Sequence, residues 1–270
     1  MTTNQIYDII VIGASKEGIE FCKQLLSKVN DIKVALVSRN FNRPIDLSAI
    51  ELINREVIFS TYNRGLLSIT LDNKTNLFTK NIVIATGTKP IKSTLKNNNI
   101  QYNLNNLKVS KSTPAIVFGS DNLAASYAIT LSKKFKYIYL CTNSLDLKCD
   151  QKYIKKIENI ANIVHLPNCN IVACKNDKDG NLAEVQLDTY SSIRCTALFM
   201  SIGRTPDTSG MSKRMIEIDS EGYIITKEFN ETTKVPNIFA IGSCTKAKHT
   251  HSISSVVNTI ISRNNFRPNN

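Results

Sequence analysis

A short glycine-bearing loop near the N-terminus has the residue spacing of a phosphate-binding turn. The loop reads Gly13-Ala-Ser-Lys-Glu-Gly18 and follows the apolar run Tyr7–Ile12. Between a strand and a helix, such a loop provides a tight first turn, close backbone approach to a diphosphate, and close helix–strand packing at its last glycine. Gly13 and Gly18 meet the first and third demands, and Ser15 places a hydroxyl at the second. Taken alone, the loop also fits a turn that binds nothing.

The elements that position this loop follow a plan that occurs twice along the chain. Strands are predicted where apolar β-branched residues run together, and helices where apolar residues recur at helical spacing. Near the N-terminus, the strand Tyr7–Ile12, the helix Glu17–Val29 and the strand Lys33–Val37 form a βαβ unit. A second unit consists of the strand Pro114–Phe118, the loop beginning at Gly119, the helix Leu123–Lys134 and the strand Lys136–Leu140.

Further elements complete the predicted fold. Alternation over Val57–Phe78 predicts an antiparallel meander, and Asn81–Ala85 is a buried strand. The remaining elements are a helix at Gln151–Asn159, strands at Ala183–Leu187, Ala197–Ile202, Tyr223–Thr226 and Ile238–Ile241, and a helix at Ser252–Arg263. Two βαβ units with strands returning at the end predict an α/β fold. It has two Rossmann-like dinucleotide-binding domains, the second inserted into the first.

Three further segments relate the chain to a known family. They are Asn81–Pro90 (NIVIATGTKP), Ser201–Thr208 (SIGRTPDT), and Glu221–Thr226 leading to Val235–Gly242. Their order and spacing resemble the pyridine nucleotide-disulfide oxidoreductases, most closely the low-molecular-mass thioredoxin reductases. The resemblance implies an FAD-type domain built from residues 1–109 and 220–270. It also implies an inserted NAD(P)-type domain over residues 110–219, and a homodimer.

The resemblance implies where a redox dithiol would lie. In thioredoxin reductases a Cys-x-x-Cys just before the second βαβ unit exchanges electrons with the flavin. The matching positions here are Asn103 and Asn106. An amide has no thiolate to attack a disulfide, so dithiol reduction is not expected and no catalytic residue is assigned. The chain is therefore predicted to be a degenerate member of the family.

The second glycine loop also departs from the family. Asp121 stands at the glycine position that faces the diphosphate of NAD(P)H. Two like unit charges 4 Å apart repel by about 4 kcal/mol at an effective dielectric constant near 20. The segment Cys141–Ser144 lacks the arginines that family members place there for the NADP 2′-phosphate. NAD(P)H binding in the family's pose is not expected.

The FAD positions are mixed. Ser38 and Arg39 stand where an acidic residue would hold the adenosine ribose, and Ser243 stands where an aspartate would contact the ribityl chain. The segment between Asn40 and Glu56 is shorter than in the family. The predicted cofactor-binding residues are Gly13, Ser15, Gly18, Ser38, Arg39, Thr86, Gly87, Gly242 and Ser243. They favour FAD binding in some form, with a lost site as the alternative.

Composition limits the partners and the location. The net charge is +12, but the positive residues are scattered, with no run longer than pairs such as Lys133-Lys134, so a nucleic-acid partner is disfavoured. No apolar run approaches the roughly 18 residues of a membrane span. The seven cysteines are widely spaced without a Cys-x-x-Cys, which predicts neither a disulfide framework nor a metal site. The short polar N-terminus carries no targeting pattern, so a cytoplasmic location is expected.

Two hypotheses of function follow. The first is a divergent flavoprotein oxidoreductase that exchanges electrons with a redox protein partner or a small acceptor. The second is a non-catalytic descendant that acts as a binding or structural component. A basic RNA-associated module ranks below both, because no charged stripe is visible in the sequence.

Overall fold

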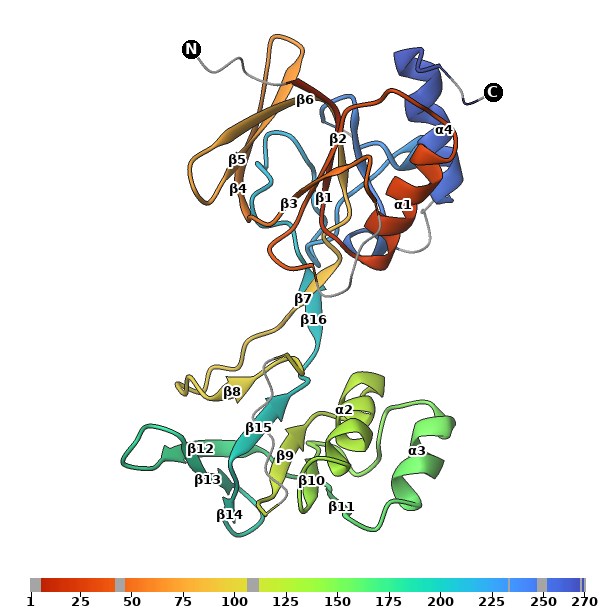
Figure 1. The fold of residues 1–270 in the computed structure, drawn as a ribbon. Coiled ribbons are helices and arrows are strands. Elements are labelled where there is room, and N and C mark those ends of the chain that lie inside the picture. The colour runs from red at the N-terminus through yellow and green to blue at the C-terminus, as the bar shows by residue number, and fades with distance from the viewer. Residues whose placement is uncertain are drawn as a thin grey trace. The chain divides into compact units, whose positions relative to one another are not determined.

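The chain forms two compact units in a computed structural model that describes residues 6–41, 47–105, 112–232, 234–246, 252–267 and 269. Unit 1 consists of residues 1–89 and 205–270, and unit 2 consists of residues 90–204. The chain passes between the units through β7 (Thr88–Pro90) and β16 (Arg204–Pro206), which pair as a two-stranded sheet. Unit 2 is therefore an insertion in unit 1, as the predicted fold class requires (Figure 1).

These unit boundaries fall elsewhere than the boundaries predicted at residues 109/110 and 219/220. The short strand β8 (Ile100–Gln101) pairs with β15 (Ala197–Met200) in the sheet of unit 2, so the segment before residue 110 belongs largely to the inserted unit. The sequence around β8 contains no continuous apolar run that would predict this pairing.

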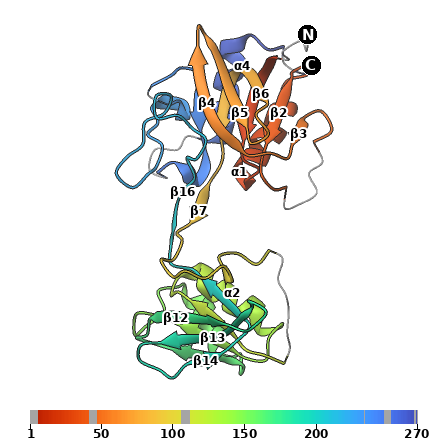
Figure 2. The same ribbon diagram turned by 90° about the vertical axis from the view of Figure 1, so that its left-hand side faces the viewer.

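Unit 1 is built on a mixed sheet whose central parallel strands are largely buried on both faces, whereas the edge strand at Glu51–Ile53 is exposed. Its strands are β1 (Ile6–Ile12), β2 (Val34–Val37), β3 (Glu51–Ile53), β4 (Val57–Asn63), β5 (Leu66–Leu71), β6 (Asn76–Ile84) and β17 (Ile238–Ala240). The order is β3-β2-β1-β6-β5-β4, and β17 also pairs with β6. β4, β5 and the start of β6 form the antiparallel meander in Figure 2, whereas β6 runs parallel to β1 and β17.

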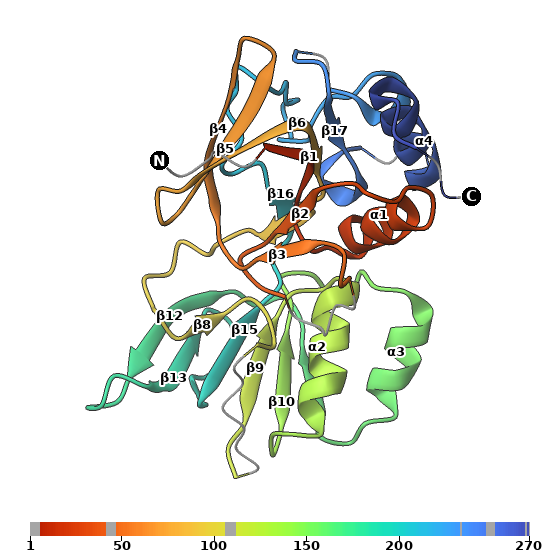
Figure 3. The ribbon, with the colours of Figure 1, turned by 45° about the horizontal axis from the view of Figure 1, so that its top comes forward.

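Two helices cover one face of this sheet. They are α1 (Lys16–Leu26) and α4 (Ile253–Asn264), which lie side by side in Figure 3. Phe21, Cys22 and Leu25 of α1 pack with Ile9 and Val11 of β1. The opposite face holds the neighbouring residues of β1, because successive side chains of a strand point to opposite sides.

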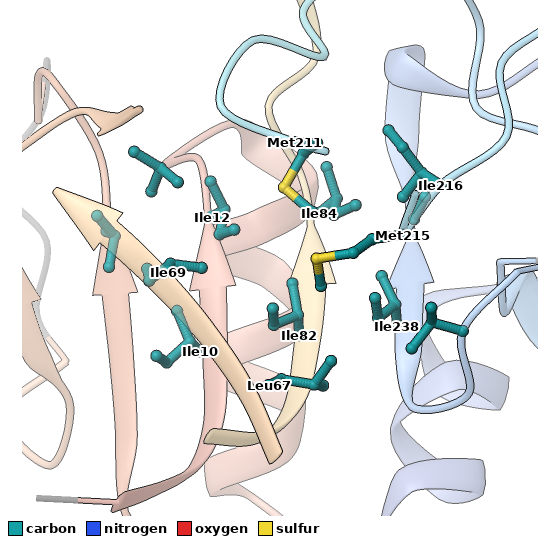
Figure 4. Close-up of a cluster of buried hydrophobic side chains, with 14 of the residues drawn as sticks. Ile10, Ile12, Leu67, Ile69, Ile82, Ile84, Met211, Met215, Ile216 and Ile238 are labelled. Carbon is teal, nitrogen blue, oxygen red and sulfur yellow. The ribbon is translucent and has the colours of Figure 1, made fainter. Parts of the chain in front are cut away.

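On that opposite face, the hydrophobic core also contains residues from the chain that follows β16. In Figure 4, Ile10 and Ile12 of β1 lie near Ile82 and Ile84 of β6, and the methionines of the segment after β16 cover them. This cluster includes Leu67, Ile69, Met211, Met215, Ile216 and Ile238. Because both faces are covered, the second half of β1, Ile9–Ile12, is one continuous apolar run rather than an alternating one.

Unit 2 contains a parallel sheet in the order β11-β10-β9-β15-β8 and an antiparallel sheet in the order β12-β13-β14. Its further strands are β9 (Ala115–Phe118), β10 (Ile138–Cys141), β11 (Ile163–Leu166), β12 (Ile171–Asn176), β13 (Leu182–Leu187) and β14 (Ile193–Arg194). The helices α2 (Asn122–Ser132) and α3 (Gln151–Glu158) lie side by side in Figure 3. β9, α2 and β10 are the second predicted βαβ unit.

Two predicted elements differ in the structure. Asn81–Ala85 is not a separate strand but the second half of β6, which continues the last strand of the meander. Tyr223–Thr226 was predicted to be a strand, and this prediction is wrong. Ile224 and Thr226 make only isolated bridges, to Ile218, Thr232 and Thr245, while the short 3-10 turns η1 (Glu228–Asn230) and η2 (Gly242–Cys244) flank β17.

Candidate functional site

Gly13 and Gly18 bring β1, β6 and α1 into close contact at the first loop. Gly13 has a φ of 105°, and a side-chain carbon there would stand 2.4 Å from the Ala85 carbonyl oxygen. A side-chain carbon on Gly18 would stand 2.3 Å from the Gly13 carbonyl oxygen. Both positions therefore exclude any side chain, which matches the first and third demands of a dinucleotide-binding turn.

Ser15 begins helix α1. Its backbone is extended, and its Oγ accepts a hydrogen bond from the Gly18 N–H at 3.1 Å, so Ser15 is the N-cap. A serine at this position satisfies one of the amide groups that a helix leaves unpaired at its start. Ser15 thus places its hydroxyl at the second glycine position, and the hydroxyl oxygen already accepts a hydrogen bond from the helix backbone.

A cavity of about 240 Å³ opens beside this helix start; we call it the first cavity. Its lining includes Gly13, Ser15, Ser38, Arg39, Thr86 and Asp207. Because β1 and β2 are parallel and both end here, the cavity lies at the carboxyl edge of the sheet, where α/β proteins of this kind bind ligands. The structure thus brings five of the predicted cofactor-binding residues together around one space.

Arg39 spans the first cavity with two ion pairs. Its Nη2 lies 2.8 Å from Asp207 Oδ2, and its Nη1 lies 3.2 Å from Glu56 Oε1. Asp207 also lies 3.3 Å from Lys89 Nζ and accepts a hydrogen bond from the Ser209 hydroxyl. Arg39 is therefore committed to protein carboxylates in the position where the ribose of a nucleotide would be held.

The carboxyl group of Asp207 is almost completely buried, with 9% of its side chain exposed. Burial acts to raise its pKa, but the hydrogen bonds from Ser209 and the charge of Lys89 outweigh burial and hold the pKa below its ordinary value. The backbone of Asp207 is fixed as well, since its carbonyl accepts from Thr86 Oγ1 at 2.6 Å and its N–H donates to the Gly87 carbonyl at 3.0 Å. Thr86 and Gly87 thus anchor this residue.

A second cavity, of about 690 Å³, is lined by Glu17, Thr88, Gly242, Ser243, Lys246 and Ser252, among others. Gly242 has a φ of 75° and begins η2. Ser243 Oγ lies 3.4 Å from the place of a side-chain carbon on Gly87, so the loops after β6 and β17 meet here. Of the four remaining predicted cofactor-binding residues, Gly242 and Ser243 line this cavity, Gly87 adjoins it, and Gly18 lines neither cavity.

The second glycine loop lies in unit 2 and carries its own negative charge. Asp121 is the N-cap of α2, and its Oδ1 accepts from the Ala124 N–H at 2.8 Å and from Ser201 Oγ at 2.9 Å. A side-chain carbon on Gly119 would stand 2.2 Å from the Ser201 carbonyl oxygen, so Gly119 is required for packing. The Asp121 carboxylate therefore occupies the helix start that would otherwise attract a bound anion.

The positions of the family's dithiol are only partly described. Asn103 is exposed, and its Oδ1 accepts a hydrogen bond from the Asn105 N–H at 3.0 Å. Asn106 lies outside the described residues. Neither observation tests the predicted alignment with the two cysteines.

The thiols of the chain are free. Burial raises the pKa of Cys244, beside Ser243, to about 11, and that of Cys195 to about 12. Burial also raises the pKa of Cys141, which packs in the core of unit 2. Because the thiolate is the reactive form, these cysteines serve as packing residues in the described structure.

Sequence reasoning missed Asp207 and Glu17 as site residues. Asp207 belongs to the segment Ser201–Thr208, but its ion pair with Arg39 joins residues that lie 168 positions apart. Glu17 lies inside the first glycine loop, and its contact with Gly242 joins distant loops in the same way. The one signal available in the sequence was an acidic residue, Glu17, inside a loop with the spacing of a phosphate-binding turn.

No group of three His, Cys, Asp or Glu side chains in the described ranges has the arrangement to hold a metal ion. Within the same ranges, no helix is long and apolar enough to cross a membrane.

The fold and the two glycine loops together define a class of two-domain, Rossmann-like dinucleotide-binding proteins. The family model described as pyridine nucleotide-disulphide oxidoreductase matches residues 45–260. The chain therefore belongs to this family, and within it resembles the thioredoxin reductases.

Individual relatives agree with this assignment. A thioredoxin reductase from Borreliella burgdorferi is 25% identical over 219 residues, covering 76% of this chain and 66% of that protein. One from Mycoplasma genitalium is 20% identical, covering 93% of this chain and 91% of the relative. Matches to the Borreliella burgdorferi and Mycoplasma pneumoniae proteins span 66% and 62% of those relatives' own lengths.

A solved structure shows the same fold over most of the chain. The thioredoxin reductase from Lactococcus lactis, in a form titled the FR conformation, superposes with a TM-score of 0.77 at 18% identity. The superposition covers 94% of this chain and 95% of that one. The two-domain α/β architecture predicted from the sequence is thereby confirmed.

Proposed function

We propose that the chain is a thioredoxin-reductase-like flavoprotein oxidoreductase that binds FAD in unit 1. The observation that carries the proposal is the position of the two cavities, which flank the first turn of α1 at the carboxyl ends of β1, β6 and β17. Ligands of open α/β sheets bind at this edge, beside the strand where the order of the sheet reverses. A dinucleotide needs two such spaces joined at a helix start.

The residues of the first cavity fit the adenosine end of FAD. Gly13 and Gly18 leave no side chain between the strand and the helix, and Ser15 lines the first cavity from the helix start. Arg39 and Arg55 both line the first cavity and could balance phosphate charge. The second cavity, with Gly242 and the start of α4, is the larger space and fits the flavin end.

When bound, FAD would supply the electron transfer itself. The protein's residues would bind and orient it. Thr86 and Gly87 hold the Asp207 backbone at one wall, and Arg39 must exchange at least one carboxylate partner for the ligand's ribose or phosphate. Ser243 offers a hydroxyl in place of an aspartate, so it can hydrogen-bond to the ligand without adding a negative charge.

The electron partner is proposed to be neither a dithiol nor NADPH. Asn103 and Asn106 lack the sulfur that a disulfide exchange requires. At the second loop, the Asp121 carboxylate caps α2 in the place of a bound diphosphate. Electrons would then pass to or from a redox protein partner or a small acceptor. A cytoplasmic homodimer without a nucleic-acid partner remains our expectation.

Purification and spectroscopy test the proposal. The purified protein is expected to carry, or to take up from added FAD, about one equivalent of flavin, and NADH or NADPH should leave that flavin oxidised. Rapid bleaching of the flavin by either nucleotide would contradict the assignment of Asp121. A matched sample unfolded in guanidinium should release the flavin, as expected for non-covalent binding.

A non-catalytic role is the second candidate, and the Arg39 network favours it. With Arg39 held by Asp207 and Glu56, part of the first cavity is filled by the protein's own ion pairs, and its volume of about 240 Å³ is below the roughly 300–1,000 Å³ of ligand pockets. A colourless protein that rejects added FAD while remaining folded would favour this candidate over the first.

A further inference from the structure

The two cavities both adjoin the first turn of α1. Ser15 lines the first cavity and Glu17, two residues later, lines the second. The loop after β6 is divided in the same way, with Thr86 in the first cavity and Thr88 in the second. A dinucleotide that fills both spaces has its diphosphate bridge at this boundary, because the bridge joins its two halves.

Glu17 is held at the boundary by packing. Its Cβ, Cγ and Cδ lie 3.1–3.3 Å from the place that a side-chain carbon on Gly242 would take, so the side chain fills the space that this glycine leaves. Glu17 is half-buried there. Its carboxylate is thus fixed beside the second cavity and the first turn of α1.

Among the described residues, no basic side chain forms an ion pair with Glu17. Lys246, which lines the second cavity, lies 2.8 Å from Asp219 and 3.3 Å from Glu221. Arg39, in the first cavity, is paired with Asp207 and Glu56. The neighbouring Lys16 is exposed at the helix start. Among the described residues of the two linings, Arg39 and Lys246 are thus paired with carboxylates other than Glu17.

We infer that Glu17 is a specificity-determining residue that disfavours a diphosphate between the two cavities. This inference rests on the proposed binding of FAD in unit 1 and deepens it. FAD is then held mainly through its adenosine and flavin ends, at an affinity reduced by repulsion between the Glu17 carboxylate and the diphosphate. Ligands without phosphate do not experience this repulsion.

A purely structural role of Glu17 makes a different prediction. An acidic residue in the first turn stabilises a helix through the helix dipole, and its removal lowers stability whatever the ligand. That role does not distinguish ligands that carry a diphosphate from ligands that lack one. It also does not predict that binding improves when the carboxylate is removed.

The test compares the wild type with Glu17→Gln and with the matched control Glu20→Gln. Glu20 lies on the same helix and accepts a hydrogen bond from Gln24 Nε2 at 2.7 Å, but lines neither cavity. Each flavin-free protein is titrated with FAD, riboflavin and adenosine by calorimetry at low and high salt, with circular dichroism to confirm folding. A second variant, Glu17→Ala, is included in case Glu17→Gln fails to fold.

We expect Glu17→Gln to bind FAD about tenfold more tightly at low salt, with a smaller gain at high salt, where the repulsion is screened. Riboflavin and adenosine binding should not change, and Glu20→Gln should bind FAD like the wild type. An equal gain for Glu20→Gln, or an equal gain for the phosphate-free ligands, would overturn the inference.

The outcomes separate the inference from the proposed function. If wild type and Glu17 variants bind FAD equally, the inference fails and the proposed function stands. If only the Glu17 variants bind FAD, the inference stands and FAD binding by the natural chain fails. If folded wild type and folded variants all reject FAD, both fail.

Discussion

The Asp207 side chain helps to hold Arg39 in place across the first cavity. The side chain of Asp207 is nearly inaccessible to solvent, yet it forms ion pairs with Arg39 and Lys89, which come from different segments of unit 1. Removing a charge partner from a buried pair leaves the other groups unsatisfied, and this costs more than losing an exposed pair. Asp207 therefore links the shape of the first cavity to the stability of unit 1.

The charge of Asp207 predicts a pH dependence of stability. Because its folded-state pKa lies below the ordinary value, Asp207 stabilises the fold at neutral pH, and this contribution is lost as pH falls through the folded pKa. Asp207→Asn should lower the free energy of unfolding at pH 7 by about 2 kcal/mol. The difference from wild type should vanish in acid. Urea denaturation at a series of pH values measures both effects.

The control for this prediction is Asp72→Asn. Asp72 is exposed and lies 3.9 Å from Arg55, so its replacement should change stability by less than about 1 kcal/mol. Equal losses for the two variants at pH 7 would contradict the role given to the buried carboxylate.

Residue-level features of this site were the hardest to predict from sequence. Gly13, Ser15 and Gly18 could be assigned because the loop is local and its spacing has a physical meaning. The contacts of Asp207 and Glu17 could not, because each depends on two loops that meet only after the sheet has formed. No local pattern encodes such a meeting.

At the scale of elements, the helix start of α2 is satisfied by the chain itself. Asp121 caps the helix and also accepts from Ser201 at the end of β15, so it ties the helix to the sheet. The equivalent start of α1 uses an uncharged serine. The two otherwise similar βαβ units thus differ in the charge of the residue that caps the helix.

This difference predicts an effect of substituting Asp121. Asp121→Ala removes the cap and should destabilise the protein by about 1 kcal/mol, whereas Asp121→Ser keeps a capping oxygen and should cost a few tenths of that. Thermal unfolding followed by circular dichroism measures both. If Asp121→Ser destabilises as much as Asp121→Ala, the carboxylate acts through its charge and not through the cap hydrogen bond.

Elements with strong local patterns were predicted closely, and elements defined by pairing were not. Ile9–Ile12 of β1 and the strands β9 and β10 are continuous apolar runs, because both faces of their sheets are covered. Tyr223–Thr226 has a similar composition, but it found only bridge partners, Ile218, Thr232 and Thr245. Strand formation there depends on neighbours that the local sequence does not specify.

At the scale of the whole molecule, the insertion of unit 2 begins and ends at adjacent residues. The Ile91 N–H donates to the Gly203 carbonyl at 3.1 Å, next to the pairing of β7 with β16. Two chain ends this close can be joined by a short linker at little cost, because loop-closure entropy is small for short separations. Unit 1 also has its own hydrophobic clusters on both faces of its sheet.

Unit 1 is therefore expected to fold without the insertion. Replacing residues 92–202 by a short Gly/Ser linker should give a protein with a cooperative thermal transition, and it should retain whatever FAD affinity the full chain has, since both cavities are lined by unit 1 alone. Circular dichroism and FAD titration of the shortened and full-length proteins test this. A product without a cooperative transition would mean that unit 1 depends on unit 2.

The built-in anion at the start of α2 has a consequence for the protein in the cell. Many nucleotide-dependent folds gain stability by mass action from their ligand and lose it when the ligand pool is depleted. In unit 2 the negative charge at the start of α2 belongs to a residue of the chain itself, Asp121, so the helix is capped without a bound ligand. The stability of unit 2 should thus not depend on the concentration of nucleotides around it.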